Sequence, residues 1–389
     1  MSYSAPIDEM RFALQCAAGF QPLASGLDSD TLNAVLEAAA TLAADQLAPL
    51  NRSGDRAGVR LEDGEVRAAP GFREAYGVFC AGGWQGLSAD PAYGGQGLPR
   101  AVAIAVFEMV HAANMSFGLL PLLTLGAIEA IEQHGAPDQK EFYLAKLISG
   151  EWSGTMNLTE PQAGSDLGAL STKATPAADG SYRITGQKIF ITWGEHDLAS
   201  NIIHLVLARI EGAPAGSKGV SLFIVPKFRD GDGSRNAVRC IGLEAKMGIH
   251  ASPTCTMAYE GATGWLIGEE NRGLVAMFTM MNAARLNIGA QGVGVAEAAY
   301  QKALACARER RQGGGPILSH PDVRRMLAVM KAKIQIGRTL CYACAVAADN
   351  GDKAREDMLT PLAKSWCTDM CVEVASLGVQ VHGGMGFVE

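Results

Sequence analysis

The sequence lacks a surplus of positive charge. Lys and Arg together number 33, against 40 Asp and Glu, which gives a formal net charge of −7 at pH 7 and a pI near 5.6. Binding to a nucleic-acid polyanion requires a concentrated basic surface. The short basic stretches "RERRQGGG" and "HPDVRR" are more typical of solvated helix ends. We therefore do not expect a nucleic acid to be the main partner.

The sequence also lacks a targeting segment and an uninterrupted membrane span. Asp8 and Glu9 stand where a secretory signal requires apolar residues, and the opening is not the Arg-rich, acid-free segment of an organelle transit peptide. Glu108, His111 and Asn114 interrupt the most apolar stretch, which predicts a buried helix pair and not a span of about 20 residues. The sequence favours a cytoplasmic protein.

Nucleotide loops and a disulfide framework are missing as well. "GAPAGSKG" lacks the spacing of a Walker loop, and "GAQGVGVAE" falls inside a predicted helix and not after a strand. The nine cysteines are an odd number without a signal peptide, which favours reduced thiols. Cys341, Cys344, Cys367 and Cys371 resemble a zinc spacing, but they lie in alanine-rich helical stretches, where packing explains small residues without a metal.

What is present is an α, then β, then α order along the chain. With 389 residues and 48% apolar composition the chain can bury a large core, and its length predicts two or three domains. Helical periodicity fills the first third, with Ser29 or Asp30 as a helix cap. Period-two strands follow in "SYRITGQKIFIT", "NIIHLVLARI", "KGVSLFIVPKF", "NAVRCIGL" and "SPTCTMAYEG", with a hairpin turn at Thr185-Gly186 and a loop over 212–218.

Long helical segments return after residue 270 and are typical of a bundle. We therefore predict an α+β multidomain protein in three parts: an N-terminal helical domain over 1–154, a small β-barrel or sandwich domain over 155–268, and a C-terminal four-helix-bundle domain over 269–389.

The stretch "MNLTEPQAGSDLGALSTKA" is the densest cluster of small polar residues. Backbone amides with Thr159 and Ser165, opened by Pro161 and Gly164, suit a planar hydrogen-bonding ligand or a phosphate. An ordinary capping linker would explain the same residues. The strand "KIFITW" likewise needs no ligand when read alone.

Five stretches in this order resemble the acyl-CoA dehydrogenase family: "TEPQAGSD", "ITGQKIFITWG", "IGEENRGL", "AARLNIGAQGVGVAEAAYQKALACARERRQ" and "VQVHGGMGF". The resemblance covers the chain from about residue 75 to its end. Finer features, among them "MSYSAPIDEMRFAL" and "LEAKMGIHASPT", are similar to the branch that contains 3-methylmercaptopropionyl-CoA dehydrogenases and broad-range fatty acyl-CoA dehydrogenases.

The resemblance implies an FAD-dependent oxidation that introduces a double bond between Cα and Cβ of an acyl thioester. A carboxylate takes the α-proton, the β-hydrogen leaves as hydride to the flavin, and electrons pass to an electron-transfer flavoprotein. No metal is required. A flavin-dependent oxidase on the same scaffold and a non-catalytic acyl-CoA-binding subunit are the alternatives, and the acyl group is not fixed.

The resemblance also assigns residues to the flavin and the substrate. Many relatives have tryptophan where Phe190 stands, and another planar ring keeps stacking possible. The flavin positions in the first and middle parts are Met156, Leu158, Thr159, Ser165, Phe190 and Thr192. The positions that reach the flavin diphosphate or adenosine, across a subunit boundary, are Arg310, Gln312, His320, Gln380, Gly383 and Gly384. These contacts imply a homodimer or a dimer of dimers.

Arg285 lies in an apolar helix, where a charge requires an anionic partner. The family position supports the substrate and the catalytic carboxylate, while a simple intrahelical ion pair is the plainer interpretation. Asn282 stands where relatives have an acidic residue near CoA, and Ser165 also meets the acyl-CoA chain. The depth of the acyl pocket depends on the helix pair over 107–125 and on Met280 and Met281.

The catalytic base is expected near the end of the chain. In the commonest family arrangement the base follows the "GGxGF" turn by three residues, whereas Glu389 follows Phe387 by two. We therefore expect the base at the residue after Glu389, so that the sequence looks truncated, with Glu389 itself as the alternative.

Overall fold

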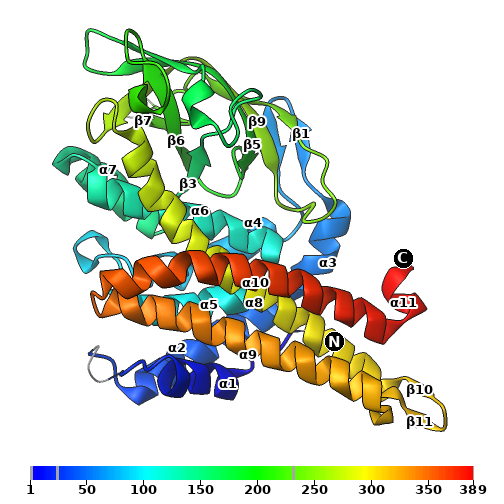
Figure 1. Cartoon of the computed structure of the whole chain (residues 1–389). Helices are drawn as coiled ribbons and strands as arrows, with labels where there is room; N and C mark the ends of the chain where they lie inside the picture. The colour runs from blue at the N-terminus through cyan, green and yellow to red at the C-terminus, as the bar shows by residue number, and fades with distance from the viewer. Residues whose placement is uncertain (1–2, 23–25, 230–232, 389) are drawn as a thin grey trace. The chain divides into compact units, whose positions relative to one another are not determined.

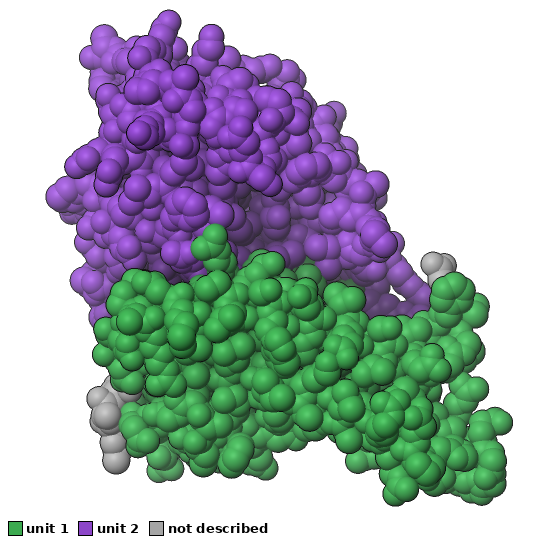
Figure 2. Space-filling view, in the orientation of Figure 1, with its two compact units in different colours: residues 1–51, 98–118, 285–389 green, residues 52–97, 119–284 purple. Residues whose placement is uncertain are grey.

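The computed structural model describes residues 3–22, 26–229 and 233–388. It contains two compact units, which Figure 2 colours separately. Unit 1 comprises Met1–Asn51, Leu98–Gly118 and Arg285–Glu389, and unit 2 comprises Arg52–Gly97 and Leu119–Ala284. Each unit thus draws on separate parts of the chain.

Unit 2 contains a seven-stranded sheet that closes on itself. The order β3-β6-β4-β5-β9-β7 is completed by pairing of β6 with β7, and β8 pairs with β9. The strands are β3 (Trp152–Asn157), β4 (Lys173–Pro176), β5 (Tyr182–Thr192), β6 (Asn201–Ile210), β7 (Val220–Pro226), β8 (Val238–Leu243) and β9 (Thr254–Ile267). Closure leaves few free edges and encloses apolar side chains such as Ile184, Val206 and Phe223. The predicted helix, sheet and helix order is confirmed.

One predicted turn in this sheet is wrong. Thr185 and Gly186 continue β5 and do not form a hairpin. An added Cβ at Gly186 would lie 2.4 Å from the hydroxyl of Thr172. The glycine therefore serves a close approach between two chain segments, which a glycine inside a strand also indicates.

The expectation of an entirely helical first third is also incomplete. Strands β1 (Arg60–Glu62) and β2 (Glu65–Arg67) form an antiparallel hairpin. Asp63 and Gly64 connect them with φ values of 52° and 80°, the backbone that a two-residue Asp-Gly turn adopts.

Along the chain, the helical segments that lie wholly within unit 2 come before the strands of this sheet or between them. They include α4 (Phe72–Ala81), the 3-10 turns η4 (Trp84–Gly86) and η5 (Pro91–Tyr93), α7 (Pro137–Ile148), and the 3-10 turns η6 (Leu167–Ala169) and η7 (Ser217–Gly219). Helix α3 (Ala48–Ala57), helix α6 (Met115–His134) and helix α8 (Gly273–Glu309) have residues in both units.

Unit 1 is a helical bundle in which α9 (Pro321–Asp349) and α10 (Lys353–His382) lie side by side (Figure 1). Its other segments are α1 (Ile7–Arg11), the π-helices η1 (Phe12–Ala17) and η3 (Leu42–Leu47), α2 (Ser29–Thr41), α5 (Arg100–Ala113), β10 (Arg311–Gln312), β11 (Gly315–Pro316), the 3-10 turn η8 (Ile317–Ser319) and α11 (Gly384–Phe387). Asp28 caps α2, since its carboxylate accepts a bond of 2.6 Å from Thr31 N. The predicted caps Ser29 and Asp30 instead form the first helical turn.

A buried charge cluster lies inside unit 1. Arg338 is fully buried and donates to Glu108 at 2.7 Å and to Glu297 at 3.0 Å. The hydroxyl of Tyr342 donates to the second oxygen of Glu108 at 2.7 Å. The Glu108 that interrupts the apolar stretch thus has strong partners, as a buried charge requires.

The apolar stretch forms the predicted helix pair, α5 and α6. Glu108 and His111 lie in α5, and Asn114 precedes α6, so none of the three interrupts α6 itself. Among the described residues, α6 is the one helix whose length and composition would suit a membrane crossing, and 72% of its most apolar window is buried inside the protein.

Candidate active site

Strand β3 and the loop that follows it contain four of the predicted site residues of unit 2. Met156 is half-buried on β3, Leu158 and Thr159 are half-buried just after it, and Ser165 is exposed. Glu160 and Ala163 exchange two backbone hydrogen bonds of 3.0 Å, which close a tight turn around Pro161. A Cβ added at Gly164 would meet no other heavy atom within 4 Å. The loop therefore presents small polar groups at an open surface.

A bulge in β5 presents Phe190. The register against β9 shifts between Lys188 and Ile191, and Phe190 takes a left-handed φ of 61° with 59% of its surface exposed. Left-handed backbone is costly for a bulky residue and is retained where neighbouring contacts hold it. Thr192, half-buried, ends the strand.

The loop and the bulge are joined directly. The amide of Ile189 donates to the carbonyl of Thr159 at 2.9 Å. The structure therefore brings together, within unit 2, the segments of Leu158 and Thr159 and of Phe190, which the sequence resemblance assigns to one ligand.

Two charged residues that the sequence analysis did not select lie under this junction. The Lys188 ammonium and the Glu160 carboxylate form an ion pair of 2.8 Å, with side chains 0% and 1% exposed. Burial raises the pKa of Glu160, but the Lys188 charge and bonds from Lys188, Thr172 and Ser171 outweigh it and hold that pKa at about 2. Burial lowers the pKa of Lys188 to about 8, although Glu160 opposes this. In the sequence, the one indication of this pair was that Glu160 and Lys188 each place a charge in a motif made mostly of small or apolar residues.

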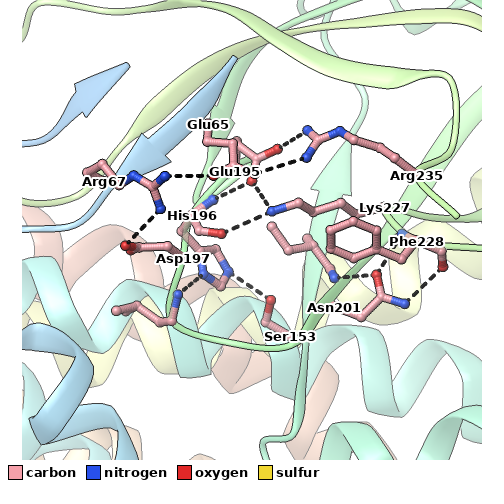
Figure 3. A network of polar contacts seen from close by, with 12 residues as sticks. Glu65, Arg67, Ser153, Glu195, His196, Asp197, Asn201, Lys227, Phe228 and Arg235 are labelled. Carbon is pink, nitrogen blue, oxygen red and sulfur yellow. Dashed lines mark hydrogen bonds and ion pairs between the residues drawn. The ribbon is translucent and has the colours of Figure 1, made fainter. Parts of the chain in front are cut away.

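A second buried network stabilises the same β-domain elsewhere. Figure 3 shows the Glu195 carboxylate between Lys227 and Arg235, with Arg235 at 2.7 Å. His196 bonds to Ser153 at 2.9 Å, and burial, together with the nearby Lys227 charge, lowers its pKa to about 3. His196 is therefore neutral at physiological pH, and we assign this network a structural role.

The predicted site residues of unit 1 gather near the ends of α8 and α10. Arg310 donates to the carbonyl of His382 at 2.8 Å and would lie 3.7 Å from a Cβ at Gly383. The ring of His320 bonds to the carbonyl of Gln312 at 3.1 Å. Gln380 is exposed on the last turn of α10, and Gly384 begins α11.

A pocket of about 550 Å³ opens beside Arg310. It is lined by Lys302, Ala305, Cys306, Glu309, Arg310 and His382. Two cations and one carboxylate give this wall a positive balance. Lys302 and His382 were not selected from the sequence.

The helix α8 carries the remaining predicted residues. Asn282 is exposed and Arg285 is half-buried, three positions apart along the helix. Met280 is fully buried, and its Cγ would lie 2.7 Å from a Cβ at Gly126. Met281 is half-buried, and Glu389 lies outside the described residues.

The four cysteines whose spacing resembles a zinc site lie on α9 and α10. Cys341 and Cys367 have their sulfur atoms 3.7 Å apart, and both are buried as free thiols. In the part of the chain that the structure describes, no three His, Cys, Asp or Glu residues are grouped as a metal site.

Comparison with known proteins identifies the family. Models of the N-terminal, middle and C-terminal domains of acyl-CoA dehydrogenases match residues 29–151, 155–262 and 271–389. A 3-methylmercaptopropionyl-CoA dehydrogenase of Ruegeria pomeroyi is 48% identical over all of this chain and 71% of its own length. The chain belongs to the acyl-CoA dehydrogenase family. It spans 65% of the length of three further curated relatives.

Solved acyl-CoA dehydrogenase structures have the same fold. Butyryl-CoA dehydrogenase of Megasphaera elsdenii matches with a TM-score of 0.80 and 27% identity, over 93% of this chain and 90% of the other. A chain in a structure described as the electron transferring flavoprotein of Acidaminococcus fermentans matches with a TM-score of 0.81 and 28% identity, over the same shares.

The residues present fit the FAD that this family typically binds. The exposed ring of Phe190 offers a planar surface, and the loop from Leu158 to Ser165 offers hydroxyl and amide donors beside it. In unit 1, Arg310 and Lys302 supply the cations that a diphosphate requires.

Proposed function

We propose that the chain catalyses, with FAD, the α,β-dehydrogenation of an acyl-CoA thioester to the trans-2-enoyl-CoA. The observation that carries this proposal is the junction in unit 2, where Ile189 N bonds to Thr159 O and Phe190 stands exposed beside it. A loop of hydrogen-bond donors joined to an outward aromatic ring is suited to the edge and face of a flavin. Membership of the acyl-CoA dehydrogenase family supports the reaction class.

In this proposal the residues of the chain bind and orient. Thr159 would donate to the flavin edge, Met156 and Leu158 would line the ring, and Phe190 would cover a ring face. Thr192 and Ser165 would complete the wall on the β-domain side. The chemistry that FAD would supply, when bound, is acceptance of the hydride from Cβ.

The diphosphate and adenosine of FAD would meet the other set of residues. Arg310 and Lys302 provide charge, Gly383 and Gly384 allow close backbone approach, and Gln312, His320 and Gln380 add polar contacts. We propose that this set serves a neighbouring subunit, in a homodimer or a dimer of dimers.

Arg285 and Asn282 are proposed to face the substrate. The Arg285 guanidinium would stabilise the thioester side of the site and the carboxylate that removes the α-proton. The position of that carboxylate remains a prediction from the register of "GGMGFVE": the residue after Glu389, or Glu389 itself.

We propose cytoplasmic localisation and an electron-transfer flavoprotein as the electron acceptor. The neighbour described as an electron transferring flavoprotein supports the second proposal. We propose that the acyl group of the substrate is a short, medium, long or methylmercapto-substituted chain, because the buried Met280 and its neighbours suit several acyl-chain lengths.

Anaerobic mixing with a panel of acyl-CoA thioesters tests the function. Purified protein with FAD should lose the visible flavin absorption and release a product lighter by two hydrogen atoms. Rapid oxygen consumption without an added acceptor would instead identify an oxidase. Tight acyl-CoA binding without flavin reduction, in protein that carries a carboxylate at the residue after Glu389, would identify a non-catalytic binding subunit.

A further inference from the structure

The ion pair between Lys188 and Glu160 is an expensive feature of the β-domain. Both side chains are shielded from water, and removing two charges from water costs several kcal/mol per ion unless other bonds compensate. Such a pair stabilises a fold weakly compared with apolar packing of the same volume. A specific geometric role therefore has to be sought in the groups that the pair contacts.

Among the described residues, the side-chain hydrogen bonds of the pair lead to the segment after β3. The Lys188 ammonium donates to the carbonyl of Leu158 at 2.9 Å. The Glu160 carboxylate accepts from the amide of Ser171 at 2.7 Å, from its hydroxyl at 2.8 Å and from the amide of Thr172 at 3.1 Å. Gln162 adds a bond of 2.7 Å. The pair thus fixes both the start and the end of the segment 158–172.

The same pair lies at the base of the β5 bulge. Lys188 directly precedes Ile189, whose amide bonds to Thr159, and the left-handed Phe190 follows. One buried ion pair therefore anchors both segments that the proposed function assigns to the flavin. In each segment the anchored residue lies within one or two positions of a proposed flavin ligand.

We propose that Lys188 and Glu160 are positioning residues of the flavin site, which fix the distance and angle between the Thr159 loop and the Phe190 bulge. This inference rests on the proposed function. Neither side chain touches the flavin; each acts through Leu158, Thr159, Ile189 and Phe190. A preorganised site binds more tightly because less ordering remains to be done on binding.

The β-domain offers a matched control. Lys227 and Glu195 form a second buried Lys–Glu pair, with side chains 8% and 2% exposed. Their partners, which include His196 and Arg235, lie outside the segment 158–172 (Figure 3). Removing this pair should disturb the stability of the same domain without moving the flavin loop.

The test compares two charge-free double variants, Lys188→Met with Glu160→Gln, and Lys227→Met with Glu195→Gln. For each folded protein, circular dichroism gives the melting temperature, and fluorescence titration gives the Kd for FAD. The absorption band of the flavin is then recorded at saturating FAD.

We expect the first double variant to raise the Kd for FAD at least ~10-fold, a free-energy change of about 1.4 kcal/mol, and to shift the flavin band. The control should leave the Kd within about 3-fold of wild type and the flavin band unchanged. This should hold even if its melting temperature falls by as much as that of the first double variant. A wild-type Kd and band in the first double variant would overturn the inference.

A milder variant keeps the test usable where the double variant does not fold. Glu160→Gln retains an amide oxygen for Ser171 and Thr172, and the neighbouring Lys188 can lose its proton. A smaller rise in Kd and a band shift in the same direction are expected, because the charge of the pair is lost while these bonds remain, and a wild-type Kd and band would overturn the inference. Wild-type protein that is folded yet binds no FAD would instead overturn the proposed function.

Discussion

The amide of Ile189 donates to the carbonyl of Thr159 at 2.9 Å, which joins the β5 bulge to the loop after β3. Neither group belongs to a regular strand pairing at this point, since the β5–β9 register shifts here. The bond fixes how far Phe190 stands from Thr159. It therefore defines the width of the surface on which a planar ligand would lie.

Phe190→Ala should weaken FAD binding about 3- to 10-fold, the range expected when an aromatic stacking contact is removed. The melting temperature without FAD should change little, because 59% of the Phe190 surface is exposed. Fluorescence titration with FAD measures the effect. Phe142→Ala, which removes another partly exposed ring of unit 2, is the control and should leave the Kd unchanged. Equal effects of the two substitutions would remove Phe190 from the site.

FAD affinity should fall as the pH rises through about 8. Burial lowers the pKa of Lys188 to about 8, so the ammonium that holds Leu158 and Glu160 is lost above that pH. Below it the affinity should be flat, because the pKa of Glu160 is about 2. The measurement is the Kd for FAD of wild type and of Lys188→Met between about pH 6 and pH 9, a range that brackets the Lys188 pKa of about 8. The fall in affinity should be present in wild type and absent in Lys188→Met.

The effect of the same titrations on stability has a definite sign. The folded pKa of Lys188 lies below its ordinary value of 10.5, so unfolding takes up a proton between about pH 8 and 10.5, and the contribution of Lys188 to the unfolding free energy rises with pH there. If FAD binding weakens between about pH 8 and 10.5, a loss of fold stability caused by Lys188 is therefore not the reason. The folded pKa of Glu160 is lowered from 4.5 to about 2, so its contribution is present above about 4.5 and is lost as the pH falls through 2.

Arg338→Met should destabilise unit 1 by about 3–5 kcal/mol, because it removes the cation that pairs with the buried carboxylates of Glu108 and Glu297. It leaves Glu297 with the longer ion-pair contact of 3.9 Å to Lys331. Chemical denaturation followed by circular dichroism measures this change. Arg325→Met removes an arginine of the same helix whose ion pair with Asp322 is exposed, and its denaturation midpoint should match wild type. A similar midpoint for Arg338→Met would show that the cluster stabilises the fold little.

Arg285→Ala should slow flavin reduction by acyl-CoA by roughly 10²-fold, the scale of removing one preorganised donor. FAD binding should persist, and Arg285→Lys should restore the rate only in part, because the planar fork is lost. Stopped-flow reduction of the FAD-loaded protein gives the rates. Arg308→Ala, an exposed position on the same helix, should reduce at the wild-type rate. An unchanged rate in Arg285→Ala would leave Arg285 with a structural role alone.

The sequence predicted the strands β5 to β9 and the long helices α8 to α10. Strands β6 and β7 do not alternate: they are largely apolar runs and are buried along nearly their whole length. Strand β3 was missed because its sequence, WSGTMN, is neither an alternating pattern nor a continuous apolar run, although it is buried closely enough that an added Cβ at Gly154 would lie 2.4 Å from Ala127. Strand β4 was missed because it has only four residues and ends on Pro176.

The candidate site was predicted by resemblance to a family and only partly by its chemistry. Thr159 and Phe190 stood out in distinctive motifs, whereas nothing local connected Glu160 with Lys188. Their pairing depends on the turn at Glu160 and Ala163 and on the bulge after Lys188. Both features arise from the closed sheet, which periodicity alone does not specify.

We propose that the loop and bulge of unit 2 form a flavin site. The most direct test is the FAD content of purified protein that is folded and assembled, measured before and after heating. We expect about one FAD per chain, bound without a covalent link and released into solution on heat denaturation. Folded, assembled protein that contains no FAD and takes up none on incubation would contradict this proposal.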